Sequence, residues 1–97
     1  MNREELTKNF LASTYNNYIL ELATGYGKSY ISIQKIAQWH IDGKPILIVI
    51  PKLVLIPNWK EELKKFKYDY LLKDITFVTY VSLPKLAGKF FEVIILD

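Results

Sequence analysis

Hydrophobic positions along this chain alternate between a pattern typical of strands and a spacing typical of helices. Ile46–Ile50 is continuously apolar and rich in β-branched residues, as in a strand buried on both faces. Further strand-like runs lie at residues 18–22, 75–80 and 91–96. Strands that alternate with helices favour a mostly parallel sheet covered on both faces. The expected fold class is therefore α/β.

Helical spacing of apolar residues predicts the elements between these strands. Helices are expected at residues 3–13, 28–41 and 53–66, with a turn or short helical piece at 82–86. Gly43 follows the second helix and is expected to be its left-handed C-cap. Pro57 must lie in the first turns of the third helix, because proline is not tolerated further inside.

The inward faces of these helices indicate where the core should lie. The second helix carries its apolar stripe on Tyr30, Ile33, Ala37 and Ile41. The third carries Ile56, Trp59, Leu63 and Phe66. This spacing makes Trp59 a core residue and not a platform for stacking bases. Trp39 and His40, near a helix end, are interpreted as packing and surface residues.

The segment Ala23-Thr24-Gly25-Tyr26-Gly27-Lys28-Ser29 joins the first predicted strand to the second predicted helix. Glycines allow the backbone amides to approach a phosphate closely, and the helix adds its free amides and positive dipole end. Lys28 can reach the β- and γ-phosphates, and the Ser29 hydroxyl can ligate Mg²⁺. We therefore expect ATP and Mg²⁺ as cofactors. The alternative is a glycine turn without a ligand, since Leu22 replaces the first glycine of the usual G-x-x-x-x-G-K-[ST] pattern.

Composition limits the remaining possibilities. The chain has 97 residues, 51% of them hydrophobic and 24% charged, which suits one globular domain over residues 1–97. The absence of cysteine excludes disulfides and thiolate metal sites, whereas carboxylates could still hold Mg²⁺. A net charge of +3 is compatible with a polyanionic partner without establishing one. Because the apolar runs are too short to cross a bilayer, a cytoplasmic location is expected, in a host cell if the protein is viral.

Four segments in order resemble the N-terminal, RecA-like motor domain of superfamily 2 helicases and translocases, most closely the Swi/Snf-type or DEAD/DEAH-like members. Residues 21–29 resemble motif I, and residues 46–55, with the helix after them, resemble motif Ia. Residues 78–83 resemble the next strand and its loop. Residues 91–97 resemble the strand of motif II and end on its first aspartate, Asp97.

The resemblance implies an ATP site built from motifs I and II. Lys28 would bind the phosphates, and Ser29 and Asp97 would bind Mg²⁺, Asp97 through water. A carboxylate at the carboxyl end of a buried strand also lies where open α/β sheets bind ligands. The alternative for Asp97 is an ordinary exposed chain end.

The resemblance also implies contact with the backbone of a nucleic acid, with DNA ahead of RNA. The residues implied are Pro51, Lys52, Thr79 and Ser82. Lysine, hydroxyl and backbone N–H groups are suitable donors to phosphate, and no base-specific reading is expected. The alternative is that Pro51 only ends a strand and that Lys52 is solvated.

The sequence departs from the family pattern in several places. The glutamate, later motifs and second motor domain of the family do not follow Asp97, so we expect an N-terminal fragment that depends on the rest of a helicase polypeptide and hydrolyses ATP weakly alone. The alternative is a non-catalytic regulatory module that binds nucleotide or nucleic acid. Residues 3–17 contain no glutamine of the kind that reads adenine in many relatives, which leaves the base preference open.

One of these departures, the missing strand after motif II, affects the order of strands in the sheet. In the family, a strand that follows motif II inserts between the motif I and motif II strands. Without it, we expect a gap or an unpaired edge, followed by self-association through that edge or by rearrangement of the sheet.

Overall fold

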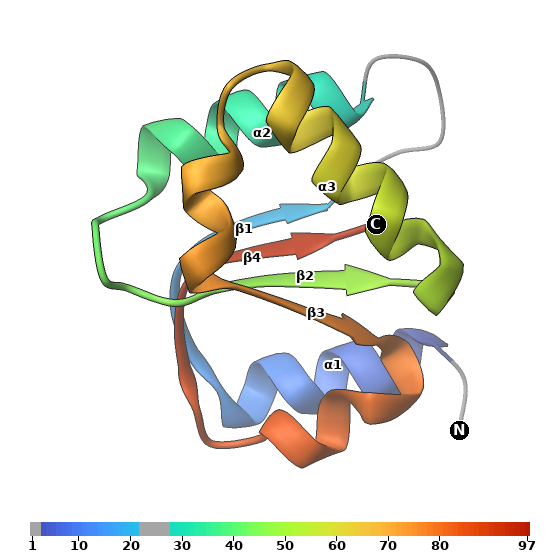
Figure 1. The fold of residues 1–97 in the computed structure, drawn as a ribbon. Helices are drawn as coiled ribbons and strands as arrows, with labels where there is room; N and C mark the ends of the chain where they lie inside the picture. The colour runs from blue at the N-terminus through green and yellow to red at the C-terminus, as the bar shows by residue number, and fades with distance from the viewer. Residues whose placement is uncertain (1–2, 22–27) are drawn as a thin grey trace.

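The computed structural model describes residues 3–21 and 28–97 and contains a four-stranded, all-parallel sheet (Figure 1). The strands are β1 (Tyr15–Glu21), β2 (Ile46–Ile50), β3 (Ile75–Thr79) and β4 (Phe90–Leu96). Their order across the sheet is β1-β4-β2-β3. The predicted α/β class is confirmed, with the architecture of a partial RecA-like domain.

Helices cover both faces of this sheet. The α-helices are α1 (Arg3–Ser13), α2 (Lys28–Trp39) and α3 (Ile56–Lys65), and the 3₁₀ segments are η1 (Leu53–Leu55), η2 (Asp69–Asp74) and η3 (Tyr80–Leu86). In Figure 1, α2 and α3 lie on one face of the sheet, and α1 and η3 lie on the other. The three-layer arrangement explains why β2 is apolar at every position, since both of its faces are covered.

Two apolar clusters fill the spaces between these layers. On the α2 and α3 face, the fully buried side chains include Ile33, Ile36, Leu63, Ile48 and Ile95. On the α1 and η3 face, the cluster includes Phe10, Leu83, Leu47, Val49 and Ile94. Alternate residues of β2 therefore belong to opposite clusters, as the period of a strand requires.

Several predicted features of the helices are confirmed and others are wrong. Trp59 is a core residue with 4% of its surface exposed, and Pro57 lies in the first turn of α3. Gly43 has a positive φ of 83°, but α2 already ends at Trp39. Gly43 therefore belongs to a separate turn, closed by the bond from Lys44 N to Ile41 O, and does not cap the helix.

The apolar stripe predicted for α2 needs correction. Tyr30 and Ile41 are 43% and 53% exposed, whereas Ile36 is completely buried beside Ile33. Ile41 lies beyond the end of the helix, so helical spacing no longer determines its direction. The buried face of α2 is thus narrower than the sequence pattern suggests.

β1 begins three residues earlier than predicted and pairs in parallel with β4 along its whole length. The register runs from Tyr15 opposite Phe90 to Glu21 opposite Leu96. No gap separates these two strands, because β1 hydrogen-bonds directly to β4. The sheet thus has the rearranged order that was expected as one alternative, and self-association stays a prediction. β1 instead forms one outer edge of the sheet, and most of its side chains are exposed.

A polar cluster at the amino end of β2 was not predicted. The His40 Nε2 and Asp74 Oδ2 atoms lie 2.8 Å apart, and the His40 side chain is only 6% exposed. The same Asp74 oxygen accepts a bond of 3.2 Å from the Gly43 amide. His40 thus joins the end of α2 to η2, a packing role that agrees with its interpretation from the sequence. Its neighbour Trp39 stacks on Tyr18 with 4.8 Å between ring centroids.

Candidate nucleotide and nucleic-acid site

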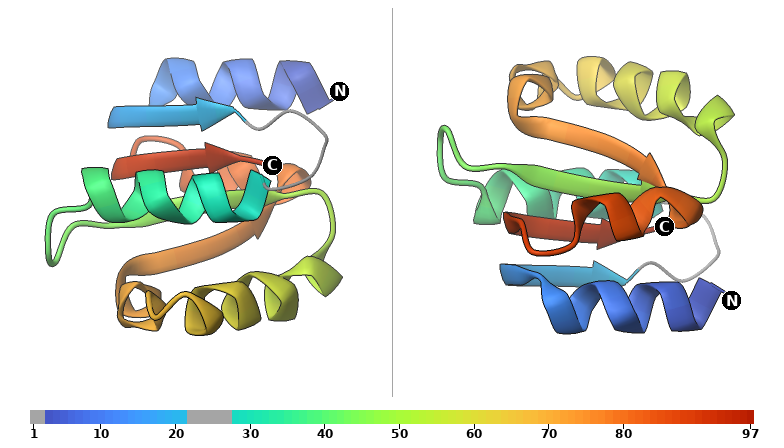
Figure 2. Two further views of the ribbon diagram at one scale, coloured as in Figure 1. Left: turned by 90° about the horizontal axis from the view of Figure 1, so that it is seen from above. Right: turned by 90° about the horizontal axis from the view of Figure 1, so that it is seen from below.

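The carboxyl ends of all four strands meet at one edge of the parallel sheet, which is where open α/β sheets bind ligands. The segments singled out from the sequence all leave the sheet at this edge. β1 leads into the predicted phosphate loop, β4 ends before Asp97, and β2 and β3 lead into the predicted nucleic-acid contacts. The two views of Figure 2 show all four strands running in the same direction.

The elements on either side of the predicted phosphate loop are the expected ones. β1 ends at Glu21 and α2 begins at Lys28, so a strand precedes the predicted segment and a helix follows it. The predicted contacts Ala23–Gly27 lie outside the described residues, as do the side chains of Lys28 and Ser29. The phosphate-binding geometry thus stays a prediction, while the backbone of Lys28 is placed at the amino end of a 12-residue helix.

Asp97 lies directly beside the strand that leads into the loop. Glu21 is paired with Leu96, the residue before Asp97, so the exit from β1 and the end of β4 are adjacent. The Asp97 amide donates to Val49 O at 2.9 Å, and its carbonyl oxygen accepts a bond of 2.6 Å from the Tyr80 hydroxyl. Asp97 is only 8% exposed, so it is not an exposed chain end.

The four predicted nucleic-acid contacts gather at the ends of β2 and β3. Ile50 is paired with Thr79, which brings Pro51 and Lys52 close to the start of η3. The Thr79 Oγ1 and Ser82 Oγ atoms are 3.4 Å apart, and both residues are half-buried. Pro51 and Lys52 are exposed. The edge thus carries hydroxyl groups and an accessible lysine in one place.

The strand order divides this edge into two adjoining halves. The predicted loop and Asp97 belong to the β1 and β4 half, and the four predicted nucleic-acid contacts belong to the β2 and β3 half. The bond from Asp97 N to Val49 O joins the halves directly. A ligand at Asp97 and a strand of nucleic acid at Lys52 would therefore occupy neighbouring positions on one rigid sheet.

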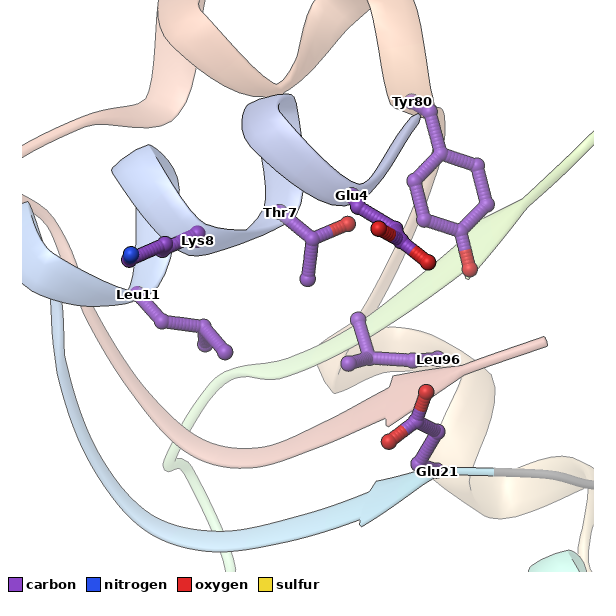
Figure 3. Close-up of a pocket in the computed structure, with 7 residues that line it drawn as sticks. All are labelled: Glu4, Thr7, Lys8, Leu11, Glu21, Tyr80 and Leu96. Carbon is purple, nitrogen blue, oxygen red and sulfur yellow. The ribbon is translucent and has the colours of Figure 1, made fainter. Parts of the chain in front are cut away.

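Sequence reasoning missed a cavity of about 700 Å³ beside the β1 and β4 half, between α1 and the sheet (Figure 3). Its lining includes Glu4 and Thr7 from α1, Glu21 from the end of β1, and Leu96 from β4. The sequence held one sign of this cavity, because the polar residues that line it recur at helical spacing along α1. That signal could not be interpreted without knowing that α1 lies under the end of β1.

The fold and the order of the four segments along the sheet edge define a helicase-like domain, the N-terminal motor domain of superfamily 2. The family model described as type III restriction enzyme, res subunit, matches residues 3–97, and the chain belongs to this family. No curated protein and no solved structure matches the chain. None of the described helices is long and apolar enough to cross a membrane. The resemblance at the level of the superfamily is thereby confirmed.

Proposed function

We propose that this chain is the nucleotide-binding part of an ATP-dependent nucleic-acid helicase or translocase and depends on further parts of that polypeptide for its motor cycle. The observation that carries this proposal is the pairing of Glu21 with Leu96. It brings Asp97 close to the strand that leads into residues 23–29, which supports joint binding of triphosphate and Mg²⁺ at this edge. Membership of a helicase-like family supports ATP as the nucleotide.

The residues at this edge fit a magnesium ion. Mg²⁺ prefers oxygen ligands, keeps several waters and usually takes only one or two protein groups together with phosphate oxygens. Ser29 and Asp97 supply a hydroxyl and a carboxylate, and the described ranges hold no larger group of metal-ligating side chains that would favour another metal. Bound there, Mg²⁺ would neutralise charge on the β- and γ-phosphates. Lys28 and the amides of residues 23–29 would orient the triphosphate.

The β2 and β3 half is the proposed contact surface for nucleic acid. Lys52 supplies a positive charge, and the hydroxyls of Thr79 and Ser82 supply donors to phosphate oxygens. The family, named for a subunit of a restriction enzyme, favours DNA over RNA. Because these groups would contact the backbone, binding should depend little on base sequence.

The nucleotide proposal is tested with Lys28→Ala and a fluorescent ATP analogue, titrated with and without Mg²⁺. Loss of the lysine charge should reduce the affinity at least about tenfold, because that charge is directed at the phosphates. Lys44→Ala is the matched control, since it removes the same charge from the exposed turn at the opposite edge of the sheet. Equal affinities of the Lys28→Ala variant and the unmodified chain would refute the phosphate-loop assignment.

The nucleic-acid proposal is tested with Lys52→Ala and a labelled single-stranded DNA over a range of salt concentrations. Removing one phosphate contact should weaken binding similarly for all sequences and lower the salt slope by about one. Lys60→Ala, an exposed lysine on α3, provides the control. An identical salt slope for the two variants would exclude Lys52 from the contact surface, and tighter binding of RNA would exclude the preference for DNA.

A further inference from the structure

The carboxyl end of α3 is closed by a left-handed turn that contains a lysine. The Lys67 amide donates to Lys64 O at 3.1 Å, and the Tyr68 amide donates to Leu63 O at 2.8 Å. These two bonds form a Schellman motif, in which the residue at the place of Lys67 has a positive φ and is usually glycine. The φ of Lys67 is 65°. A residue with a side chain therefore occupies a turn that favours glycine.

This lysine is an exception among the residues that the structure describes. The other described residues with a positive φ are Gly43 and Gly88, so Lys67 is the only one of them that carries a side chain. A left-handed backbone costs free energy in any residue with a Cβ, whereas glycine adopts it without that cost. Residues held in such conformations point to a function of the side chain.

Two further lysines lie directly before this turn. Lys64 and Lys65 occupy the last turn of α3, and both are exposed, as is Lys67. None of the three forms an ion pair with another described residue. Residues 64–70 contain these three lysines and one acidic residue, Asp69, and thus carry a net charge of +2. Unpaired ammonium groups in solvent are suitable contacts for the phosphates of a nucleic acid.

Aromatic rings lie among these lysines. Tyr70 is 57% exposed, and its ring centroid is 6.2 Å from that of Tyr68. The Lys65 Nζ atom lies 5.4 Å from the centroid of the Phe66 ring. Basic side chains beside aromatic rings suit single-stranded nucleic acid, because phosphates contact the charges while unpaired bases stack on the rings. A duplex keeps its bases stacked inside and offers few free base faces to an exposed tyrosine.

The end of α3 is separate from the carboxyl edge of the sheet. α3 follows β2 and runs back in the opposite direction to the strands (Figure 2). η2 (Asp69–Asp74) then leads directly into Ile75, the first residue of β3. The lysines at the end of α3 therefore lie toward the amino ends of the strands, whereas Lys52 lies beyond the carboxyl end of β2.

We propose that the end of α3 and the start of η2 form a second contact surface for nucleic acid, which prefers single strands. This surface, the α3 patch, consists of Lys64, Lys65, Lys67 and Tyr70. The lysines contact successive phosphates, and one base stacks on Tyr70. Membership of a helicase-like family supports nucleic acid as the partner. The proposal goes beyond the proposed function, which places nucleic acid only at the carboxyl ends of β2 and β3.

The first test replaces Lys67 by glycine and measures both unfolding by denaturant and binding of a labelled oligothymidylate. Lys67→Gly should bind more weakly and lower the salt slope by about 0.7, the contribution of one phosphate contact to a single strand. It should also unfold at a higher denaturant concentration, because glycine adopts the left-handed turn without cost. Lys85→Ala removes the same charge from η3, on the opposite face of the sheet, and should leave the salt slope unchanged.

The two measurements on Lys67→Gly separate a contact from a cap. If the variant is more stable but binds with unchanged affinity and salt slope, Lys67 only closes the helix and the α3 patch is overturned. If weaker binding is accompanied by a lower unfolding midpoint, the lysine acts through the fold, which also overturns its role as a contact.

The second test concerns the stacked base. Tyr70→Ala should weaken binding of the oligothymidylate at least about fivefold, because it removes the stacking surface, and Tyr70→Phe should retain the affinity. Tyr15→Ala is the matched control, since Tyr15 is 73% exposed on β1 and lies outside the patch. A duplex of the same length should bind more weakly than the single strand. Tighter binding of the duplex, or an unchanged affinity of Tyr70→Ala, would overturn the preference for single strands.

Comparison with Lys52→Ala separates the α3 patch from the contact surface of the proposed function. If Lys52→Ala weakens binding and neither Lys67→Gly nor Tyr70→Ala does, the patch is overturned and the proposed function stands. If only the variants of the patch weaken binding, the patch stands and the contact at the carboxyl edge falls. If the unmodified chain binds neither single strand nor duplex, both are overturned.

Discussion

β1 and β2 deliver residues to the same edge of the sheet, but the surrounding structure supports them very differently. All five residues of β2 have 0% exposed surface, and β2 is paired on both sides, with β4 and β3. β1 is paired only with β4, and Tyr15 and Ile19 are 73% and 42% exposed. A central strand is fixed by packing on two faces and two ladders, whereas an edge strand depends mainly on one ladder.

This difference affects the two halves of the candidate site. Of the proposed nucleic-acid contacts, Pro51 and Lys52 follow the completely buried central strand β2, whereas Thr79 and Ser82 follow β3, the other edge strand. The proposed phosphate-binding segment follows β1 in the sequence, and the end of β1 is held by its register with β4. Conditions that loosen β1 should therefore weaken nucleotide binding before they weaken the contact of Lys52 with nucleic acid.

The largest expected effect comes from shortening a side chain in β2. Ile48→Ala should lower the free energy of unfolding by about 3 kcal/mol, because it removes buried methyl groups and leaves a cavity in a covered layer. The matched change in β1, Ile19→Ala, should cost less than about 1 kcal/mol, since that side chain is 42% exposed. Chemical denaturation of both variants measures the difference. Equal losses would mean that the edge strand is as firmly packed as the centre.

A smaller effect is expected where β1 contributes a part-buried hydrogen bond to a buried carboxyl group. Asn17 Nδ2 donates a bond of 2.8 Å to Glu92 Oε2, and Glu92 is only 2% exposed. Asn17→Ala removes this donor from a buried carboxyl group and should cost about 2 kcal/mol. Asn16→Ala, at the neighbouring position of the same strand, should cost clearly less. If the two variants unfold at the same denaturant concentration, the Asn17–Glu92 bond does not hold β1 in place.

The contrast between these strands also explains which parts of the fold could be predicted. The bounds of β2 were predicted correctly, because a continuous apolar run has few other interpretations in an α/β sequence. β1 was predicted only from Tyr18 onward, since Asn16 and Asn17 break the apolar pattern of an edge strand. The 3₁₀ segment η2 was missed because its turns are stabilised by non-local contacts, among them the bond between His40 and Asp74.

For the candidate site, the sequence showed which residues follow each strand, but it did not show which strands are neighbours in the sheet. The loop, Asp97 and Lys52 could each be assigned to the end of a predicted strand. The direct pairing of β1 with β4 could not be deduced from the sequence, because strand order is determined by packing across the whole sheet. The gap expected between these two strands is not present. The pocket was missed for the same reason, since Glu21 and Leu96 line it together because β1 and β4 are neighbours.

The smallest effect is expected at the amino end of β2, where Lys73 contacts Asp42. The hydrogen bond from Lys73, followed by its positive charge, lowers the pKa of Asp42, and Asp42 in turn raises the pKa of Lys73. Both groups are fully exposed, so solvent screens the pair and Lys73→Gln should leave the unfolding midpoint at neutral pH unchanged within error.

The pH dependence of this pair distinguishes it from the packed interactions of β2. A lowered pKa in the folded state means that the contribution of Asp42 exists above its unfolded pKa and disappears as the pH falls through its folded pKa. Lys73→Gln should therefore move the Asp42 pKa upward toward its ordinary value in an NMR titration of the carboxyl carbon, and Lys85→Gln should not. If the pKa of Asp42 stays low in Lys73→Gln, a group other than Lys73 lowers it. If Lys73→Gln loses much stability at neutral pH, solvent exposure does not weaken the pair. Either result would mean that the exposed pair near the start of β2 does not differ, in its effect on stability, from the buried contacts within β2.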